Sequence, residues 1–198
     1  MPIIVDTEYT TWPGALESGW AAPDQHREIV QIAALRVDNE WREITPFEHF
    51  VKPFFNPELS PLFVELTGIT QELIDNYGNG FARAMSDFRF FCGGEPVICM
   101  NADEAVFREN CALLQIEFDM PSFHRLRPYL ERVGVNLDNV SSGDLHQLTD
   151  TPLLGQTHNA LHDVRSMAAW LRHSGLSGHD LNPLPTGAPT TDPRSAHA

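Results

Sequence analysis

The order of strand-like and helix-like segments is what most restricts the fold of this chain. Pro2–Thr10, Ile29–Val37 and Glu48–Lys52 predict three successive strands near the start. Pro96–Met100 is apolar at every position, as in a strand buried on both faces. Helical segments alternate with strands only after the first three. We therefore expect an α/β fold with a mixed sheet and helices on both faces.

Helical spacing or capping residues mark most of the other segments. The expected helices are Leu59–Leu66, Thr70–Asn76, a segment that ends at Cys92, one that begins after Asn101, Arg127–Val133, Gly143–Leu148 and Ala160–His173. Asn101 and Glu104 have the spacing of a capping box. The segment between the first two strands, 11–27, contains two prolines and two glycines and is predicted to be a long loop.

The charge balance limits the partners of the chain. It carries 13 basic and 27 acidic side chains, a formal net charge of −14, and its only lysine is Lys52. Neutralisation of phosphates by Lys and Arg supplies most non-specific affinity for nucleic acid. The composition therefore disfavours a protein that grips long nucleic acid through a basic face. A convergent group of carboxylates would instead bind divalent cations.

Length and composition indicate one domain. With 198 residues and 42% hydrophobic side chains, the chain can form a single core. Residues 174–198 contain four prolines and three glycines, so we expect a folded domain over 1–173 followed by a disordered tail. No apolar run reaches the roughly 18 to 20 residues of a membrane span, and no signal peptide is recognisable, so the expected location is the cytoplasm. The expected state of the three cysteines (Cys92, Cys99 and Cys111) is a buried, reduced thiol.

Asp6 and Glu8 are the first candidate functional residues. They are two positions apart in a predicted strand, so their side chains point to the same face. Ile3–Val5 indicates that this strand is central and buried, where two carboxylates are costly unless a cation compensates them. The alternative is a strand-end pair that faces solvent.

The segment from His158 to Asp163 is more specific. At this composition the pattern H-x-A-x-x-D is expected only about 0.05 times by chance. The two ends can share one site if His158 lies in the loop before the helix, Asn159 is the N-cap and Asp163 lies in the first turns. The helix dipole favours an ionised carboxylate there. An ordinary surface histidine is the alternative for His158.

Asp103 stands at the start of the helix that follows the buried strand Pro96–Met100. Open α/β sheets often place functional groups at this point. A first-turn acid that only stabilises the helix is the alternative, and the adjacent Glu104 competes with Asp103 for either role.

Taken together, the three motifs resemble those of the DnaQ-like 3′–5′ exonucleases, in the subclass with four acids and a histidine (DEDDh). The matching segments are Val5–Glu8, Asn101–Asp103 and His158–Asp163, and they occur in the order of the family. Phe55–Asp75 is similar to the ERI-type branch, whose members act largely on RNA. The resemblance covers residues 1–173. Relatives usually carry Trp-Gly where this chain has Cys99 and Met100.

The resemblance implies a ribonuclease H-like fold with a five-stranded mixed sheet. It also implies two divalent metal ions, Mg²⁺ or Mn²⁺, with the ligands Asp6, Glu8, Asp103 and Asp163. His158 corresponds to the general base. The implied substrate contacts are Thr7, Leu66, Thr67, Gly68 and Asn101, with Leu66 packed on the last base. Trp12 and Trp20 are further candidates for stacking on a base.

The expected function is that of a metal-dependent 3′–5′ exonuclease that trims single-stranded RNA ends or short overhangs and releases nucleoside monophosphates. A DNA exonuclease of the same family is the first alternative. A non-catalytic nucleic-acid-binding module on the same fold is the second, although binding alone does not need a costly acidic cluster. A carboxylate-pair glycosidase is a third, and it explains fewer of the residues.

Overall fold

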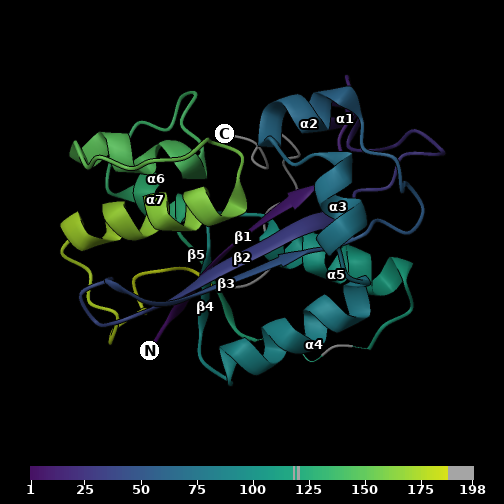
Figure 1. Ribbon diagram of the computed structural model, residues 1–198. Coiled ribbons are helices and arrows are strands. Elements are labelled where there is room, and N and C mark those ends of the chain that lie inside the picture. The colour runs from purple at the N-terminus through teal and green to yellow at the C-terminus, as the bar shows by residue number, and fades with distance from the viewer. Residues whose placement is uncertain (118, 120, 187–198) are drawn as a thin grey trace.

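Five strands form one mixed sheet in the computed structural model, which describes residues 1–117, 119 and 121–186 (Figure 1). The strands are β1 (Ile3–Tyr9), β2 (Ile29–Val37), β3 (Glu43–Phe50), β4 (Val97–Cys99) and β5 (Phe123–Arg125). Their order across the sheet is β3-β2-β1-β4-β5. The first three strands pair antiparallel, and β4 and β5 run parallel to β1. This confirms the predicted α/β fold with a mixed sheet.

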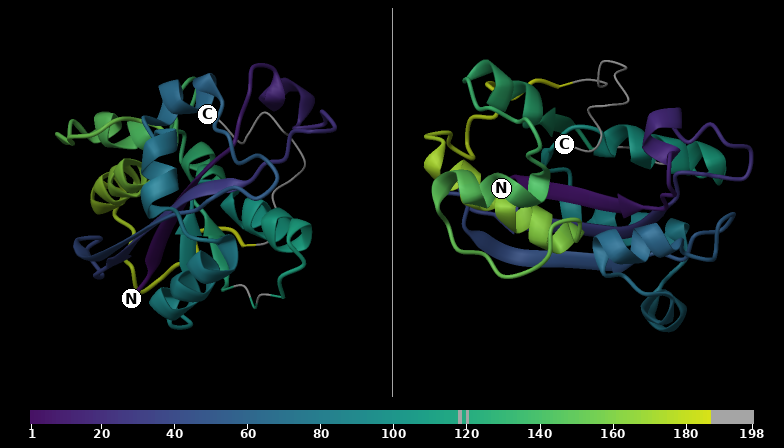
Figure 2. Two further views of the ribbon diagram at one scale, coloured as in Figure 1. Left: turned by 45° about the vertical axis from the view of Figure 1, so that its right-hand side comes forward. Right: turned by 90° about the horizontal axis from the view of Figure 1, so that it is seen from above.

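Helices cover both faces of the sheet. They are α1 (Ala15–Ser18), α2 (Pro61–Thr67), α3 (Gln71–Tyr77), α4 (Phe81–Cys92), α5 (Asp103–Leu113), α6 (Arg127–Arg132), the 3₁₀ helix η1 (Ser142–Thr149) and α7 (Ala160–His173). α6 and α7 lie on one face, and α4 and α5 lie on the other (Figure 1). β1 points toward the end of the molecule that holds α1, α2 and α3 (Figure 2).

The alternation of side chains along β1 decides where its carboxylates lie. Ile4 packs in the core beneath α7, whereas Ile3 and Val5 pack against α4 and α5. All three are fully buried, so β1 is a central strand, as its composition predicts. Because side chains alternate with a period of two, Asp6 and Glu8 continue the row of Ile4 and face α7.

Some elements differ from the prediction. β3 begins at Glu43 rather than Glu48, because it is an edge strand whose exposed face carries polar residues and Pro46 and therefore lacks an apolar pattern. The expected capping box at Asn101 does not form, since the N-cap of α5 is Ala102. β5 has only three residues, too few for a recognisable alternation.

The expectation of a disordered tail from residue 174 is wrong for residues 174–186. Leu181 and Leu184 are buried in the same core as α7. The backbone N–H of Arg125 donates to Pro185 O at 2.8 Å, and Trp41 Nε1 donates to Leu176 O at 2.8 Å. These isolated leucines fill gaps without a helix or strand around them, so their spacing carries no signal. Residues 187–198 lie outside the described part of the chain.

All three cysteines are free thiols, as expected, but only Cys92 and Cys99 are buried, and Cys111 is half-buried. Among the described residues, no helix has both the length and the apolar character needed to cross a membrane.

Leu184→Ala tests whether the segment after α7 is part of the core. Leu184 is 2% exposed, so its truncation should lower the free energy of unfolding by about 2 to 5 kcal/mol in chemical denaturation. Leu154, which is 98% exposed, provides the control, and Leu154→Ala should change the same quantity by less than about 0.5 kcal/mol. Equal effects of the two substitutions would show that residues 174–186 do not pack as described.

Candidate functional site

Three carboxylates converge between the end of β1 and the first turn of α7. One oxygen from each of Asp6, Glu8 and Asp163 lies within 4.8 Å of the others. Asn159 caps α7 as predicted, and its side chain accepts a hydrogen bond from the N–H of His162 at 3.4 Å. The side chain of Gln31, buried on β2, accepts a hydrogen bond from the N–H of Ala160 at 2.9 Å. This contact fixes the start of α7 over the sheet, so Asp163 faces β1.

Asp103 brings a fourth carboxylate to the same pocket from the other side of β1. Its Oδ1 accepts a hydrogen bond from Thr7 Oγ1 at 2.8 Å. The pocket is lined by Asp6, Thr7, Glu8, Tyr9, Met100, Asn101, Ala102, Asp103, Val106, Ser141, Ser142, His158 and Asp163. Glu104 does not line it and instead accepts two hydrogen bonds from Arg108, at 3.0 and 2.8 Å. Asp103 is therefore the residue of this pair that faces the pocket.

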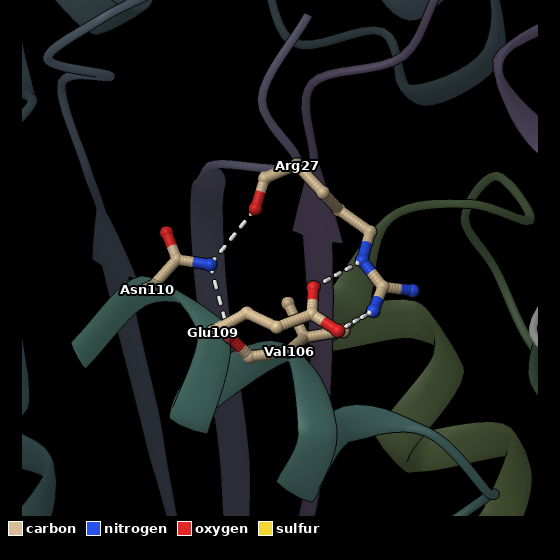
Figure 3. Close-up of polar contacts among 4 residues, drawn as sticks. All are labelled: Arg27, Val106, Glu109 and Asn110. Atoms are coloured by element: carbon tan, nitrogen blue, oxygen red, sulfur yellow. Dashed lines mark hydrogen bonds and ion pairs between the residues drawn. The ribbon is translucent and has the colours of Figure 1, made fainter. Parts of the chain in front are cut away.

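Polar contacts on α5 hold the helix that carries Asp103 (Figure 3). The buried amide of Asn110 donates to Arg27 O at 2.8 Å and to Val106 O at 2.9 Å, and its oxygen accepts from the N–H of Ile29 at 2.9 Å. Arg27 Nε also donates to Glu109 Oε2 at 2.9 Å. α5 is thus attached to the start of β2, and Asp103 at its first turn is held beside β1.

The four carboxylates are shielded from water and repel one another. Burial, followed by the neighbouring carboxylates, raises the pKa values of Asp6 and Glu8 well above their usual range. Burial is also the main cause that raises the pKa of Asp103 to about 6 and that of Asp163 to about 7. Such shifts identify groups whose ionised form lacks compensation.

The donor set fits divalent metal ions. Asp163 Oδ1 is buried and has no hydrogen-bond partner among the described residues. An oxygen-only set of carboxylates suits Mg²⁺ or Mn²⁺, which prefer oxygen ligands. Divalent ions would supply positive charge directly at the carboxylates. We expect Asp6, Glu8, Asp103 and Asp163 to hold them.

His158 lies in the loop before α7, as predicted, and lines the pocket of the carboxylates. Its backbone is in the left-handed region, with φ 65°. Non-glycine residues seldom adopt this conformation, so a constrained local structure holds it there. Burial lowers the pKa of the half-buried imidazole, which favours its neutral form near pH 7.

A second cavity, of about 370 Å³, adjoins the first. Glu8, Tyr9 and His158 line both cavities. Trp12 and Leu66 also line the second, and the side chain of Leu66 is 38% exposed. The cavity lies between the loop after β1 and α2, and it has the size and apolar walls suited to a nucleobase.

The other predicted substrate contacts have different surroundings. Thr67 lines the second cavity, but its hydroxyl donates to Phe63 O at 2.9 Å within α2. Gly68 ends α2 with φ 71°, and a Cβ there would lie 3.1 Å from Gln156 Oε1. Asn101 lines the carboxylate pocket. Trp20 packs edge-on against Tyr9, and its Nε1 donates to Thr10 O at 2.9 Å. These contacts hold the loop after β1, and Trp20 does not line the second cavity.

Sequence reasoning missed Tyr9 and Ser142. Tyr9 is the residue after the first motif and lines both cavities. The hydroxyl of Ser142 donates to Asp163 Oδ2 at 2.9 Å. Tyr9 directly follows Glu8, and this adjacency to the first motif could have marked it, whereas Ser142 lies in a polar segment with no periodicity or motif around it.

Titration of the metal-free protein with Mn²⁺ should raise its melting temperature. An ion that binds only the folded chain stabilises it by about 2.7 kcal/mol at one hundred times its Kd, or roughly 5 to 10 °C for a domain of this size. Asp103→Asn should reduce this gain, because it removes a carboxylate from the pocket. The adjacent Glu104→Gln is the control and should retain it, since Glu104 pairs with Arg108. An unchanged melting temperature of the wild-type chain in Mn²⁺ would refute metal binding.

Comparisons with known proteins agree with this geometry. The profile of an exonuclease family, RNase_T, matches residues 3–171. The nuclease domain of 3′hExo, described as a DEDDh family member bound to rAMP, is 17% identical with a TM-score of 0.76, and the alignment covers 96% of each chain. A 3′-exonuclease described as recognising the 3′ end of a histone mRNA stem-loop is 17% identical with a TM-score of 0.77, over 97% of this chain and 87% of that chain.

A DNA-bound relative has the same fold. E. coli exonuclease I in complex with a dT13 oligonucleotide is 20% identical with a TM-score of 0.63, over 87% of this chain and 40% of that chain. No curated protein sequence matches the chain. At these identities the solved structures establish the ribonuclease H-like fold, and the match to the family profile over most of the sequence establishes the family. The chain therefore belongs to the RNase_T family of exonucleases.

Proposed function

We propose that this protein is a metal-dependent exonuclease that removes nucleotides from the 3′ end of single-stranded RNA or of short RNA overhangs. The observation that carries this proposal is the convergence of four carboxylates and a histidine in one pocket beside a second cavity of about 370 Å³. The product would be a nucleoside monophosphate, because hydrolysis of the last phosphodiester bond releases one nucleotide, whose base the second cavity would hold.

The four carboxylates would hold two divalent ions, Mg²⁺ or Mn²⁺. When bound, the ions supply activation of a water, orientation of the scissile phosphate and stabilisation of the leaving 3′-oxygen. Asp6 and Glu8 approach from β1, Asp163 approaches from α7 and Asp103 from α5. Because these elements belong to the core of the fold, the ligands are fixed before the substrate arrives.

His158 would accept the proton of the attacking water. It lines both cavities, so it stands where the terminal nucleotide and the carboxylates meet. A general base must be unprotonated to act, and burial favours the neutral imidazole. The N-cap at Asn159 and the left-handed backbone of His158 hold the imidazole-bearing loop at the start of α7.

The second cavity would hold the last base. Leu66 and Trp12 offer apolar surface on which a base can pack, and stacking of a base on an aromatic side chain is independent of sequence. Gly68, at the end of α2, would let the backbone approach the nucleotide closely. We propose Thr7, Thr67 and Asn101 as backbone or side-chain contacts at the edges of the two cavities.

The choice of RNA over DNA depends on the similarity of Phe55–Asp75 to the ERI-type branch and on the relatives that contain rAMP or a histone mRNA stem-loop. The DNA-bound structure of E. coli exonuclease I favours the alternative of a DNA exonuclease. The net charge of −14 disfavours tight binding of long duplexes but does not forbid an enzyme that handles only one strand end, since the ions would contribute positive charge at the phosphates.

The most informative experiment is incubation of end-labelled RNA and DNA oligonucleotides with the protein in Mg²⁺, Mn²⁺ or EDTA. We expect a ladder that shortens from the 3′ end of single-stranded RNA, more slowly on DNA, and no products in EDTA. A ladder on DNA alone would establish the alternative substrate. Binding of both oligonucleotides without any product in either metal would indicate a non-catalytic binding module.

His158→Ala tests the general base. We expect kcat to fall by about 10² to 10⁴, because the proton acceptor is lost, while Mn²⁺ affinity in calorimetry stays near that of the wild type. His173→Ala, at the other end of the same helix, is the matched control and should leave both quantities unchanged. If kcat of the His158 variant equals that of the wild type, another group accepts the proton.

A further inference from the structure

The start of η1 contacts the carboxylate of Asp163 at two points. Ser142 Oγ donates a hydrogen bond to Asp163 Oδ2 at 2.9 Å. Ser142 also lines the pocket that contains Asp6 and Asp163, so one neutral donor lies beside the carboxylates from β1 and α7.

Gly143 leaves no room for a side chain beside the other oxygen of the same carboxylate. A Cβ at this position would lie 2.5 Å from Asp163 Oδ1 and 2.8 Å from Thr157 Cγ2, both shorter than real Cβ contacts. Gly143 lies within a 3₁₀ helix, whose backbone conformation other residues can adopt. Lack of space, and not backbone freedom, is what requires glycine here.

We propose that Ser142 and Gly143 are positioning residues for Asp163 and that together they fix the rotation of its carboxylate for metal binding. The inference rests on the proposed function and adds residues outside the three motifs. The terminal torsion of an aspartate is broad, so an unsupported carboxylate samples many orientations. The hydrogen bond from Ser142 and the close backbone of Gly143 select one of them.

A hydroxyl is suited to this task because it carries no charge. A lysine or arginine in the place of Ser142 would pair with Asp163 and would compete with the metal ions for its oxygens. A hydroxyl donates one hydrogen bond and leaves the negative charge of the pocket intact for the ions. Partners that orient a metal ligand typically contribute 10- to 100-fold in metal affinity or activity.

The test compares Mn²⁺ binding by the full-length chain in four variants. Mn²⁺ affinity is measured by electron paramagnetic resonance, and kcat and KM are measured with an end-labelled RNA oligonucleotide. Ser142→Ala and Gly143→Ala should each weaken Mn²⁺ binding by about 10- to 100-fold and should lower kcat more than they raise KM. Melting temperatures and circular dichroism establish that each variant is folded.

Two matched controls separate positioning from a merely structural role. Ser166→Ala removes a buried hydroxyl that also links α7 to η1, since it accepts a hydrogen bond from the N–H of His146 at 3.0 Å. Gly80→Ala adds a methyl group where no atom lies within 4 Å. Both should leave Mn²⁺ affinity unchanged, whatever they do to the melting temperature.

The outcomes distinguish this inference from the proposed function. Wild-type Mn²⁺ affinity in folded Ser142→Ala and Gly143→Ala would overturn the inference and leave the proposed function standing. Equal weakening by Ser166→Ala would also overturn it, because the effect would then come from the general attachment of η1. A wild-type chain that binds no Mn²⁺ would overturn both, whereas one that binds Mn²⁺ without cleaving either oligonucleotide would overturn only the nuclease proposal.

Discussion

The mutual repulsion of four carboxylates at the end of a buried strand is the constraint on which the rest of this structure depends. Taking carboxylates out of water is unfavourable, and placing them within a few ångströms of one another adds to the penalty. The fold tolerates this because β1 pairs with β2 along its length, pairs with β4 at Ile3 and Ile4, and is covered on both faces, which holds its end beside α7 and α5. The stability of the core therefore supplies the free energy that keeps the site assembled.

The fold was largely predictable, because its information is carried by local patterns. The apolar character of β1, β2 and β4 and the amphipathic pattern of α7 each mark an element directly. The sequence alone did not mark β3 in full or the packing of Leu181 and Leu184. The extent of an edge strand and the packing of a loop against the core depend on tertiary contacts. The spacing of apolar residues along the sequence does not encode those contacts.

The same division applies to the site. Asp6 and Glu8 follow from strand alternation, and the place of Asp163 follows from the N-cap at Asn159. The choice between Asp103 and Glu104 could not be made from sequence, because both are in the first turn of α5. It depends on the hydrogen bond from Thr7 and on the pairing of Glu104 with Arg108, which are tertiary and helix-surface contacts respectively.

Three residues, Glu8, Tyr9 and His158, form a wall that belongs to both cavities. A ligand in the second cavity, beside Leu66, would therefore contact the same side chains that line the carboxylate pocket. A nucleic acid whose last nucleotide lacks its base would leave these three side chains without a packing partner on the side of the second cavity. Under the proposed function, such an abasic end should slow turnover as well as weaken binding, because the proposed sites of the base and of the scissile phosphate share these residues.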